Sequence, residues 1–124
     1  MTHKVLVVDD FEPIRKMYID VLKRCNVDIL EAANGEDALR LINTEKPDII
    51  VLDVDMPRLS GLEVLTRVRR NPSTKEIPVI MVTANHMVEH SDNTYDADLL
   101  LIKPVSPIDL VSFVRRLLPV TKEI

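Results

Sequence analysis

The sequence predicts an α/β protein in which a doubly wound, five-stranded parallel sheet lies between two layers of helices. Its 124 residues are the length of one domain. A composition of 46% hydrophobic and 29% charged residues is that of an ordinary globular chain. Short, continuous apolar runs alternate along the sequence with segments of helical periodicity. This alternation is typical of a parallel sheet whose strands are connected by helices.

Four apolar runs are expected to form strands, and each stops at a polar residue. They cover residues 5–8, 49–52, 79–82 and 99–102. Continuous rather than alternating apolar residues are typical of strands that are buried on both faces. Residues 27–30 form a fifth run of mixed polarity, which we expect at an edge of the sheet.

Amphipathic helices are expected between the strands, because apolar residues recur there at intervals of three and four. Pro13 lies near the expected first turn of the first helix, where proline is tolerated. Asn34, Ser60 and Ser106 are expected to cap the later helices, and Ser60 has the spacing of a capping box. The segment 84–98 has few apolar residues, so a helix there should be short or poorly anchored.

Right-handed crossover connections place helices on both faces of such a sheet. The common order of five strands is then 2-1-3-4-5, and ligands bind at the carboxyl ends of the strands, at the switch point between strands 1 and 3. The residues that terminate the strands are therefore the candidate functional residues.

Three carboxylates are expected to converge at this switch point. Asp9 and Asp10 follow the first apolar run, and Asp53 follows the third. Two like charges 4 Å apart repel by roughly 4 kcal/mol at an effective dielectric constant near 20. The cluster should therefore retain a proton or bind a cation. Oxygen ligands from carboxylates favour Mg²⁺, whereas Zn²⁺ is disfavoured because no His or Cys ends a strand.

The ends of the other two strands offer groups that suit a phosphoryl ligand. Thr83 follows the fourth apolar run and supplies a hydroxyl, and Lys103 follows the fifth and supplies a positive charge. A cation, an ammonium and a hydroxyl around one carboxylate fit stabilisation of a transferring phosphoryl group. A carboxylate can itself accept that group as an acyl phosphate, and Asp53 is the central candidate.

Other classes of function are disfavoured by composition. Two glycines are too few for a dinucleotide fingerprint or a P-loop. A formal net charge of −4 without long basic runs argues against direct nucleic-acid binding, and no apolar run is long enough for a membrane span. A single cysteine excludes an internal disulfide and fits a reducing, cytoplasmic compartment.

Four motifs give the chain a family resemblance over essentially its whole length. They are VVDD at 7–10, LDVDMP at 52–57 followed by Gly61, VTA at 82–84 and KP at 103–104. In this order they resemble the receiver domain of two-component response regulators, a flavodoxin-like three-layer sandwich. The stretch 7–11 is especially similar to free-standing regulators of the chemotaxis type.

The resemblance implies a metal site and its ligands. Asp10 and Asp53 would ligate Mg²⁺ directly, and Asp9 would act largely through water. The backbone carbonyl of Asp55 would supply a further ligand. Asp55 also occupies a position at which the family tunes dephosphorylation.

The resemblance also implies roles around the phosphoryl group. Asp53 would accept it from the phosphohistidine of a histidine kinase, Lys103 would pair with one phosphoryl oxygen, and Thr83 would move to bind another. Pro104 would follow a cis peptide bond. Leu100 departs from the pattern, because the family usually places an aromatic switch residue there.

We therefore expect residues 1–124 to form a single receiver domain without an effector domain. It would be a phosphoacceptor switch rather than an enzyme, limited to self-catalysed phosphotransfer and autodephosphorylation. Its partners would be a sensor histidine kinase or phosphotransfer protein and a downstream protein target, with a possible phosphorylation-dependent dimer. The alternatives are a Mg²⁺-dependent aspartyl-phosphate phosphatase or phosphotransferase, and a receiver-like binding module that is not phosphorylated.

Overall fold

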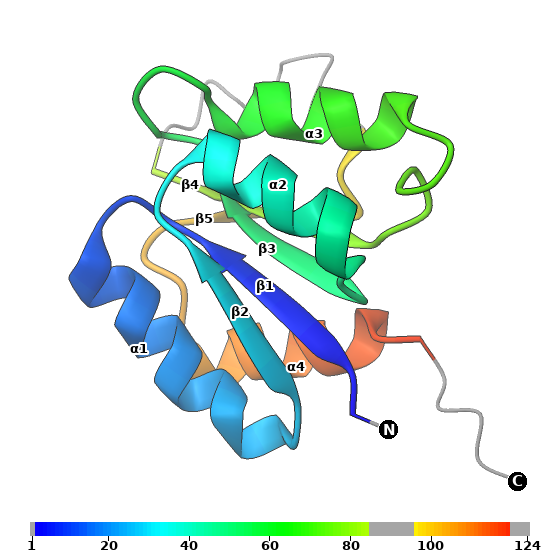
Figure 1. Ribbon diagram of the computed structural model, residues 1–124. Helices are drawn as coiled ribbons and strands as arrows, with labels where there is room; N and C mark the ends of the chain where they lie inside the picture. The colour runs from blue at the N-terminus through cyan, green and yellow to red at the C-terminus, as the bar shows by residue number, and fades with distance from the viewer. Residues whose placement is uncertain (1, 85–95, 120–124) are drawn as a thin grey trace, which may run out of the picture.

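The computed structural model describes residues 2–84 and 96–119, which form one parallel sheet covered by helices on both faces (Figure 1). The strand order is β2-β1-β3-β4-β5, as the sequence predicted, and every neighbouring pair is parallel. The strands are β1 (Lys4–Val8), β2 (Asp28–Ala32), β3 (Ile49–Asp53), β4 (Val79–Thr83) and β5 (Leu99–Ile102).

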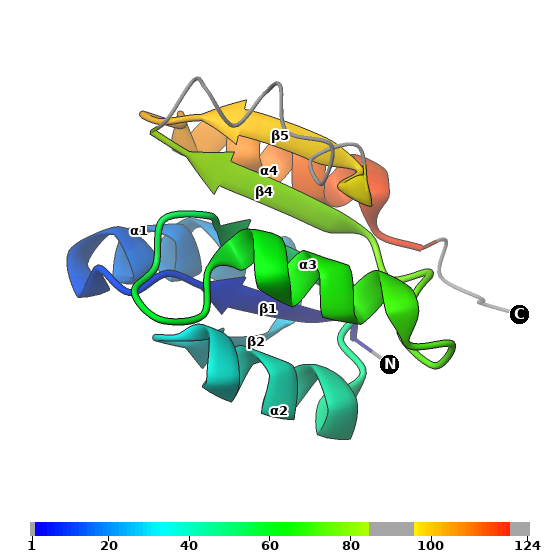
Figure 2. The same ribbon diagram turned by 90° about the horizontal axis from the view of Figure 1, so that it is seen from above.

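The helices divide into two pairs, one on each face of the sheet (Figure 2). Their bounds are α1 (Glu12–Leu22), α2 (Gly35–Glu45), α3 (Gly61–Arg70) and α4 (Pro107–Leu117), and a short 3₁₀ turn (Lys23–Cys25) follows α1. The pair α1 and α4 packs on one face, and the pair α2 and α3 packs on the other. Right-handed crossovers between parallel strands produce this arrangement.

The strand period of two divides the core into two halves. In β1, Val5 and Val7 face the side of α1 and α4, whereas Leu6 and Val8 face the side of α2 and α3. All four side chains are almost completely buried, which explains the continuous apolar run. The edge strands β2 and β5 are less buried, because each has only one neighbouring strand.

The expected helix caps are partly confirmed. The Asn34 side chain accepts a hydrogen bond from the backbone N–H of Asp37 at 2.8 Å, and Ser60 accepts one from Glu63 at 3.4 Å. Ser106 occupies the N-cap position of α4 as expected, but its side chain makes no capping hydrogen bond. Pro107 is the first residue of α4, where its ring fixes φ in the helical range.

Two further expectations differ from the structure. The edge strand begins at Asp28 and extends to Ala32, rather than covering 27–30, because its register with β1 continues to the end of that strand. In α1, the recurring apolar residues Tyr18 and Leu22 are buried as their spacing predicts, but Met17 is 37% exposed and Ile19 is buried in its place. The expectation of a weak helix in 84–98 falls mostly on residues 85–95, which lie outside the described residues.

The last turn of α3 is attached to the sheet by Arg69. Its guanidinium donates to the carbonyl oxygens of Lys75, Ile77 and Asp96 and to the carboxylate of Asp98. The Asp98 carboxylate also accepts from the N–H of Val79, the first residue of β4.

Within the described residues, no helix has the length and apolar character that would be needed to cross a membrane.

Candidate functional site: an acidic cluster at the carboxyl ends of the strands

The strand ends bring the expected site residues together at one edge of the sheet. Asp9 directly follows β1, Asp53 is the last residue of β3, and Thr83 is the last residue of β4. Lys103 follows β5, and its N–H donates to the carbonyl oxygen of Thr83 at 2.8 Å. The parallel arrangement therefore places an acid, a hydroxyl and an ammonium from separate segments side by side.

Asp9, Asp10 and Asp53 form an acidic cluster. One carboxylate oxygen from each lies within 4.8 Å of the others. Asp9 and Asp53 are only 1% and 2% exposed, whereas Asp10 is exposed to solvent. Lys103 Nζ lies 3.4 Å from Asp53 Oδ1 and 3.5 Å from Asp9 Oδ2, so one ammonium faces two buried carboxylates.

Close packing of the loop after β3 determines the surroundings of Asp53. The N–H of Gly61, the first residue of α3, donates to the carbonyl oxygen of Val54 at 3.1 Å. A Cβ at position 61 would collide with the carbonyl oxygen of Asp53, so this approach requires glycine. The backbone N–H of Asp55 donates to Asp53 Oδ1 at 3.2 Å and fixes the direction of that carboxylate.

Burial and charge perturb the ionisation of both central groups. Burial, reinforced by the charge of Asp9, raises the pKa of Asp53 from 3.8 to about 6, although Lys103 acts in the opposite direction. Burial lowers the pKa of Lys103, but Asp53 and Asp9 more than offset this effect, so its pKa lies above 10.5. The carboxylates are thus crowded, and one ammonium does not compensate them fully.

This donor set fits a hard divalent cation. Asp9 Oδ2 is buried and accepts no hydrogen bond within the described part of the chain, a costly arrangement that a cation would relieve. Mg²⁺ prefers oxygen ligands, typically one or two carboxylates together with water and phosphate oxygens. Asp9, Asp10 and Asp53 would hold the ion, and a bound cation would lower the negative charge density around Asp53.

The Asp55 side chain binds groups at the end of β4. Its Oδ2 accepts hydrogen bonds from the Thr83 hydroxyl at 2.9 Å and from the N–H of Ala84 at 3.2 Å. Its carboxylate is not part of the acidic cluster of Asp9, Asp10 and Asp53. The sequence did not indicate this link between the ends of β3 and β4.

Arg15 is a further residue near the site that the sequence analysis missed. It is 8% exposed and donates to the carbonyl oxygen of Asp9 at 2.8 Å. A signal was present, since Arg15 falls on the same stripe of α1 as the buried Tyr18, Ile19 and Leu22. An arginine on a buried stripe needs partners, and the end of β1 supplies one.

Comparison with known proteins agrees with this geometry. Residues 5–115 match the family described as the response regulator receiver domain. The chain belongs to this family. Among solved structures, the chemotaxis response regulator CheY4 of Vibrio cholerae is 32% identical, with a TM-score of 0.87 over 95% of this chain and 100% of that one. The response regulator TrrA of Thermotoga maritima, in complex with Mg²⁺-BeF, is also 32% identical, with a TM-score of 0.86 over the same shares.

Curated relatives of this receiver domain are regulators of transcription by name. The phosphate regulon transcriptional regulatory protein PhoB of Pseudomonas aeruginosa is 37% identical over 92% of this chain and 51% of its own length. The alkaline phosphatase synthesis transcriptional regulatory protein PhoP of Bacillus subtilis is 38% identical over 95% of this chain and 49% of its own length. The chain thus spans about half the length of these relatives.

The Lys103–Pro104 peptide bond is cis, as the family resemblance implied.

Proposed function

We propose that this receiver domain accepts a phosphoryl group on Asp53, in a Mg²⁺-dependent reaction, from the phosphohistidine of a sensor histidine kinase or phosphotransfer protein. One Asp53 oxygen forms the new O–P bond while the N–P bond breaks, and the imidazole nitrogen keeps the electron pair. A bound Mg²⁺ would supply charge stabilisation for the phosphoryl oxygens. The altered surface would then change contacts with a downstream protein.

The observation that carries the proposal is the position of the buried Asp53. Its carboxylate lies between two other acids and the Lys103 ammonium, which is 3.4 Å from Oδ1. The positive charge of Lys103 would favour the oxygens of an incoming phosphoryl group. Thr83, at the end of the next strand, would donate its hydroxyl to a further oxygen.

A small-molecule phosphodonor tests the proposal without knowledge of the kinase. Acetyl phosphate with Mg²⁺ should add the mass of one phosphoryl group to the intact protein, and hydroxylamine should remove it. Borohydride reduction followed by peptide mass spectrometry should locate the label at Asp53. A protein that stays unlabelled at every Mg²⁺ concentration, or that carries the label elsewhere, would contradict the proposal.

Asp55 is expected to slow phosphorylation, because its carboxylate binds the Thr83 hydroxyl and the Ala84 N–H in the resting protein. Both donors must leave Asp55 before they can bind a phosphoryl oxygen. A hydrogen bond to a charged group contributes about 1.5–3 kcal/mol, and less where the acceptor is exposed. We expect Asp55→Ala to accelerate labelling by acetyl phosphate about fivefold.

The matched control for this prediction is Asp55→Asn. Asparagine removes the charge but keeps an oxygen that can accept from Thr83. If the hydrogen bonds restrain the reaction, Asp55→Ala should react faster than Asp55→Asn. Equal rates for the two variants would assign the effect to charge alone.

A further inference from the structure

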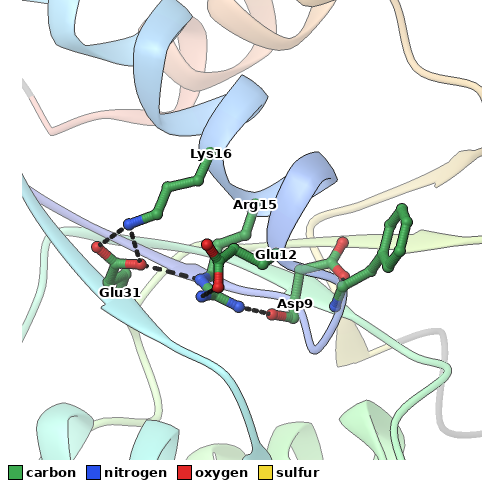
Figure 3. Close-up of polar contacts among 6 residues, drawn as sticks. Asp9, Glu12, Arg15, Lys16 and Glu31 are labelled. Atoms are coloured by element: carbon green, nitrogen blue, oxygen red, sulfur yellow. Dashed lines mark hydrogen bonds and ion pairs between the residues drawn. The ribbon is translucent and has the colours of Figure 1, made fainter.

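Arg15 joins three elements next to the acidic cluster (Figure 3). From α1, its Nη1 donates to the carbonyl oxygen of Asp9 at 2.8 Å, and its Nε donates to Glu31 Oε1, on β2, at 2.9 Å. Lys16 Nζ binds both oxygens of the same Glu31 carboxylate, at 3.1 and 3.0 Å. The hydrogen bond from Arg15, followed by that from Lys16, lowers the pKa of Glu31, so this carboxylate stays ionised.

The hydrogen bonds of Asp9 leave one of its carboxylate oxygens, Oδ2, for the acidic cluster. Its N–H donates to the carbonyl oxygen of Ala32 at 3.2 Å, and its carbonyl oxygen accepts from Arg15. Its Oδ1 accepts from the N–H of Phe11 at 2.9 Å. The remaining oxygen, Oδ2, is the buried atom without a hydrogen-bond partner, and Lys103 Nζ lies 3.5 Å away.

The backbone of Asp9 is therefore held from β2 through its N–H and from α1 through its carbonyl oxygen. The guanidinium suits this position, because its planar fork can bind a carbonyl and a carboxylate at the same time in fixed directions. Glu31 aligns the fork through Nε, and Nη1 is then directed at Asp9. If the Asp9 carbonyl were released, the peptide could rotate and Oδ2 could turn away from Asp10 and Asp53.

We propose that Arg15 is a positioning residue for divalent-cation binding, and that it acts by holding the Asp9 peptide so that Oδ2 points into the acidic cluster. This inference rests on the proposed function, since it concerns the same Mg²⁺ site. Arg15 does not itself contact the ion. Its contribution comes through Asp9, and Lys16 makes no comparable contact with Asp9 among the hydrogen bonds of the described residues.

The sign of the effect separates positioning from simple electrostatics. Arg15 is a cation beside a cation site, so removing its charge alone would strengthen Mg²⁺ binding. Loss of a residue that orients a metal ligand weakens metal binding, typically by 10–100-fold. A weaker affinity after removal of this positive charge would therefore be a specific indication of positioning.

Isothermal titration of Mg²⁺ into the folded protein at fixed pH tests the proposal. We expect Arg15→Met to raise the Mg²⁺ dissociation constant about tenfold, within the range seen for residues that orient metal ligands. Arg15→Lys keeps the charge and should raise it by a smaller factor, because one ammonium cannot replace the fork. Lys16→Met is the matched control, since it removes the same charge from the same helix and leaves the Asp9 contact intact; its dissociation constant should not rise.

A second comparison tests whether the effect passes through Asp9. In an Asp9→Asn background, Arg15→Met should not raise the dissociation constant further, because only the electrostatic effect of the lost charge remains and that effect favours Mg²⁺ binding. Three results would overturn the inference. The first is an unchanged or tighter Mg²⁺ affinity in both Arg15 variants, and the second is a loss of affinity in Lys16→Met as large as that in Arg15→Met. The third is a tenfold loss of affinity from Arg15→Met that persists in the Asp9→Asn background. Because Arg15→Lys retains the charge and most of the packing, it serves if Arg15→Met does not fold. Absence of Mg²⁺ binding in the unaltered protein would instead contradict the proposed function, and the inference with it.

Discussion

Asp53→Asn is expected to abolish labelling by acetyl phosphate, and by a histidine kinase, at any Mg²⁺ concentration. Asparagine has nearly the same shape, but its amide is not a nucleophile and cannot form an acyl phosphate. The Asp53 side chain is 2% exposed, and its Oδ1 lies 3.4 Å from Lys103 Nζ. Hydroxylamine-sensitive phosphate on the variant, at the level of the unaltered protein, would show that another residue is the acceptor.

The same variant should remain folded and, without metal, become more stable. The pKa of Asp53 is raised from 3.8 to about 6, so the folded protein binds more protons than the unfolded chain between these values. Stability is therefore lost as pH rises through this window. Because a tenfold change in proton affinity corresponds to about 1.4 kcal/mol, the penalty above pH 6 is about 3 kcal/mol.

Denaturation in EDTA at several pH values measures this effect. The difference in unfolding free energy between Asp53→Asn and the unaltered protein should grow from about pH 4 to pH 6 and then stay constant. A difference that is the same across this range would contradict the raised pKa. A cooperative transition in the variant would show that loss of labelling does not result from loss of the fold.

Mg²⁺ is expected to produce the second large effect, a rise in thermal stability that depends on Asp10. A ligand that binds only the folded state at 100 times its dissociation constant adds about 2.7 kcal/mol. In a domain of this size, that corresponds to several degrees in Tm. Asp10 is exposed, so Asp10→Asn should remove a ligand at little cost to the fold and weaken the Mg²⁺ response at least tenfold in concentration.

Asp20→Asn provides the matched control for the metal prediction. Asp20 is also exposed and lies on α1, outside the acidic cluster, so the substitution makes the same change in net charge. Its Mg²⁺ response should resemble that of the unaltered protein. A melting curve of the unaltered protein that does not change with Mg²⁺ would contradict the metal site, and an equal loss in both variants would assign the response to net charge.

The order of the strands and the convergence of Asp9, Asp53, Thr83 and Lys103 could be predicted from the sequence. Each of these residues follows a continuous apolar run, and parallel strands present their carboxyl ends at one edge. Helix caps were less predictable. Asn34 and Ser106 both occupy N-cap positions, yet only the Asn34 side chain makes a capping hydrogen bond.

The sequence by itself determined which residues end the strands, and thereby the fold and the acids that meet at its edge, because burial on both faces requires continuous apolar runs. Only the tertiary structure decided how those acids are held. The Thr83–Asp55 bond, the Arg15–Asp9 bond and the raised pKa of Asp53 depend on side chains from different elements, in directions that no spacing along the chain specifies. Periodicity along the sequence predicts on which face of a helix or strand a residue lies, whereas tertiary packing determines which side chain it contacts.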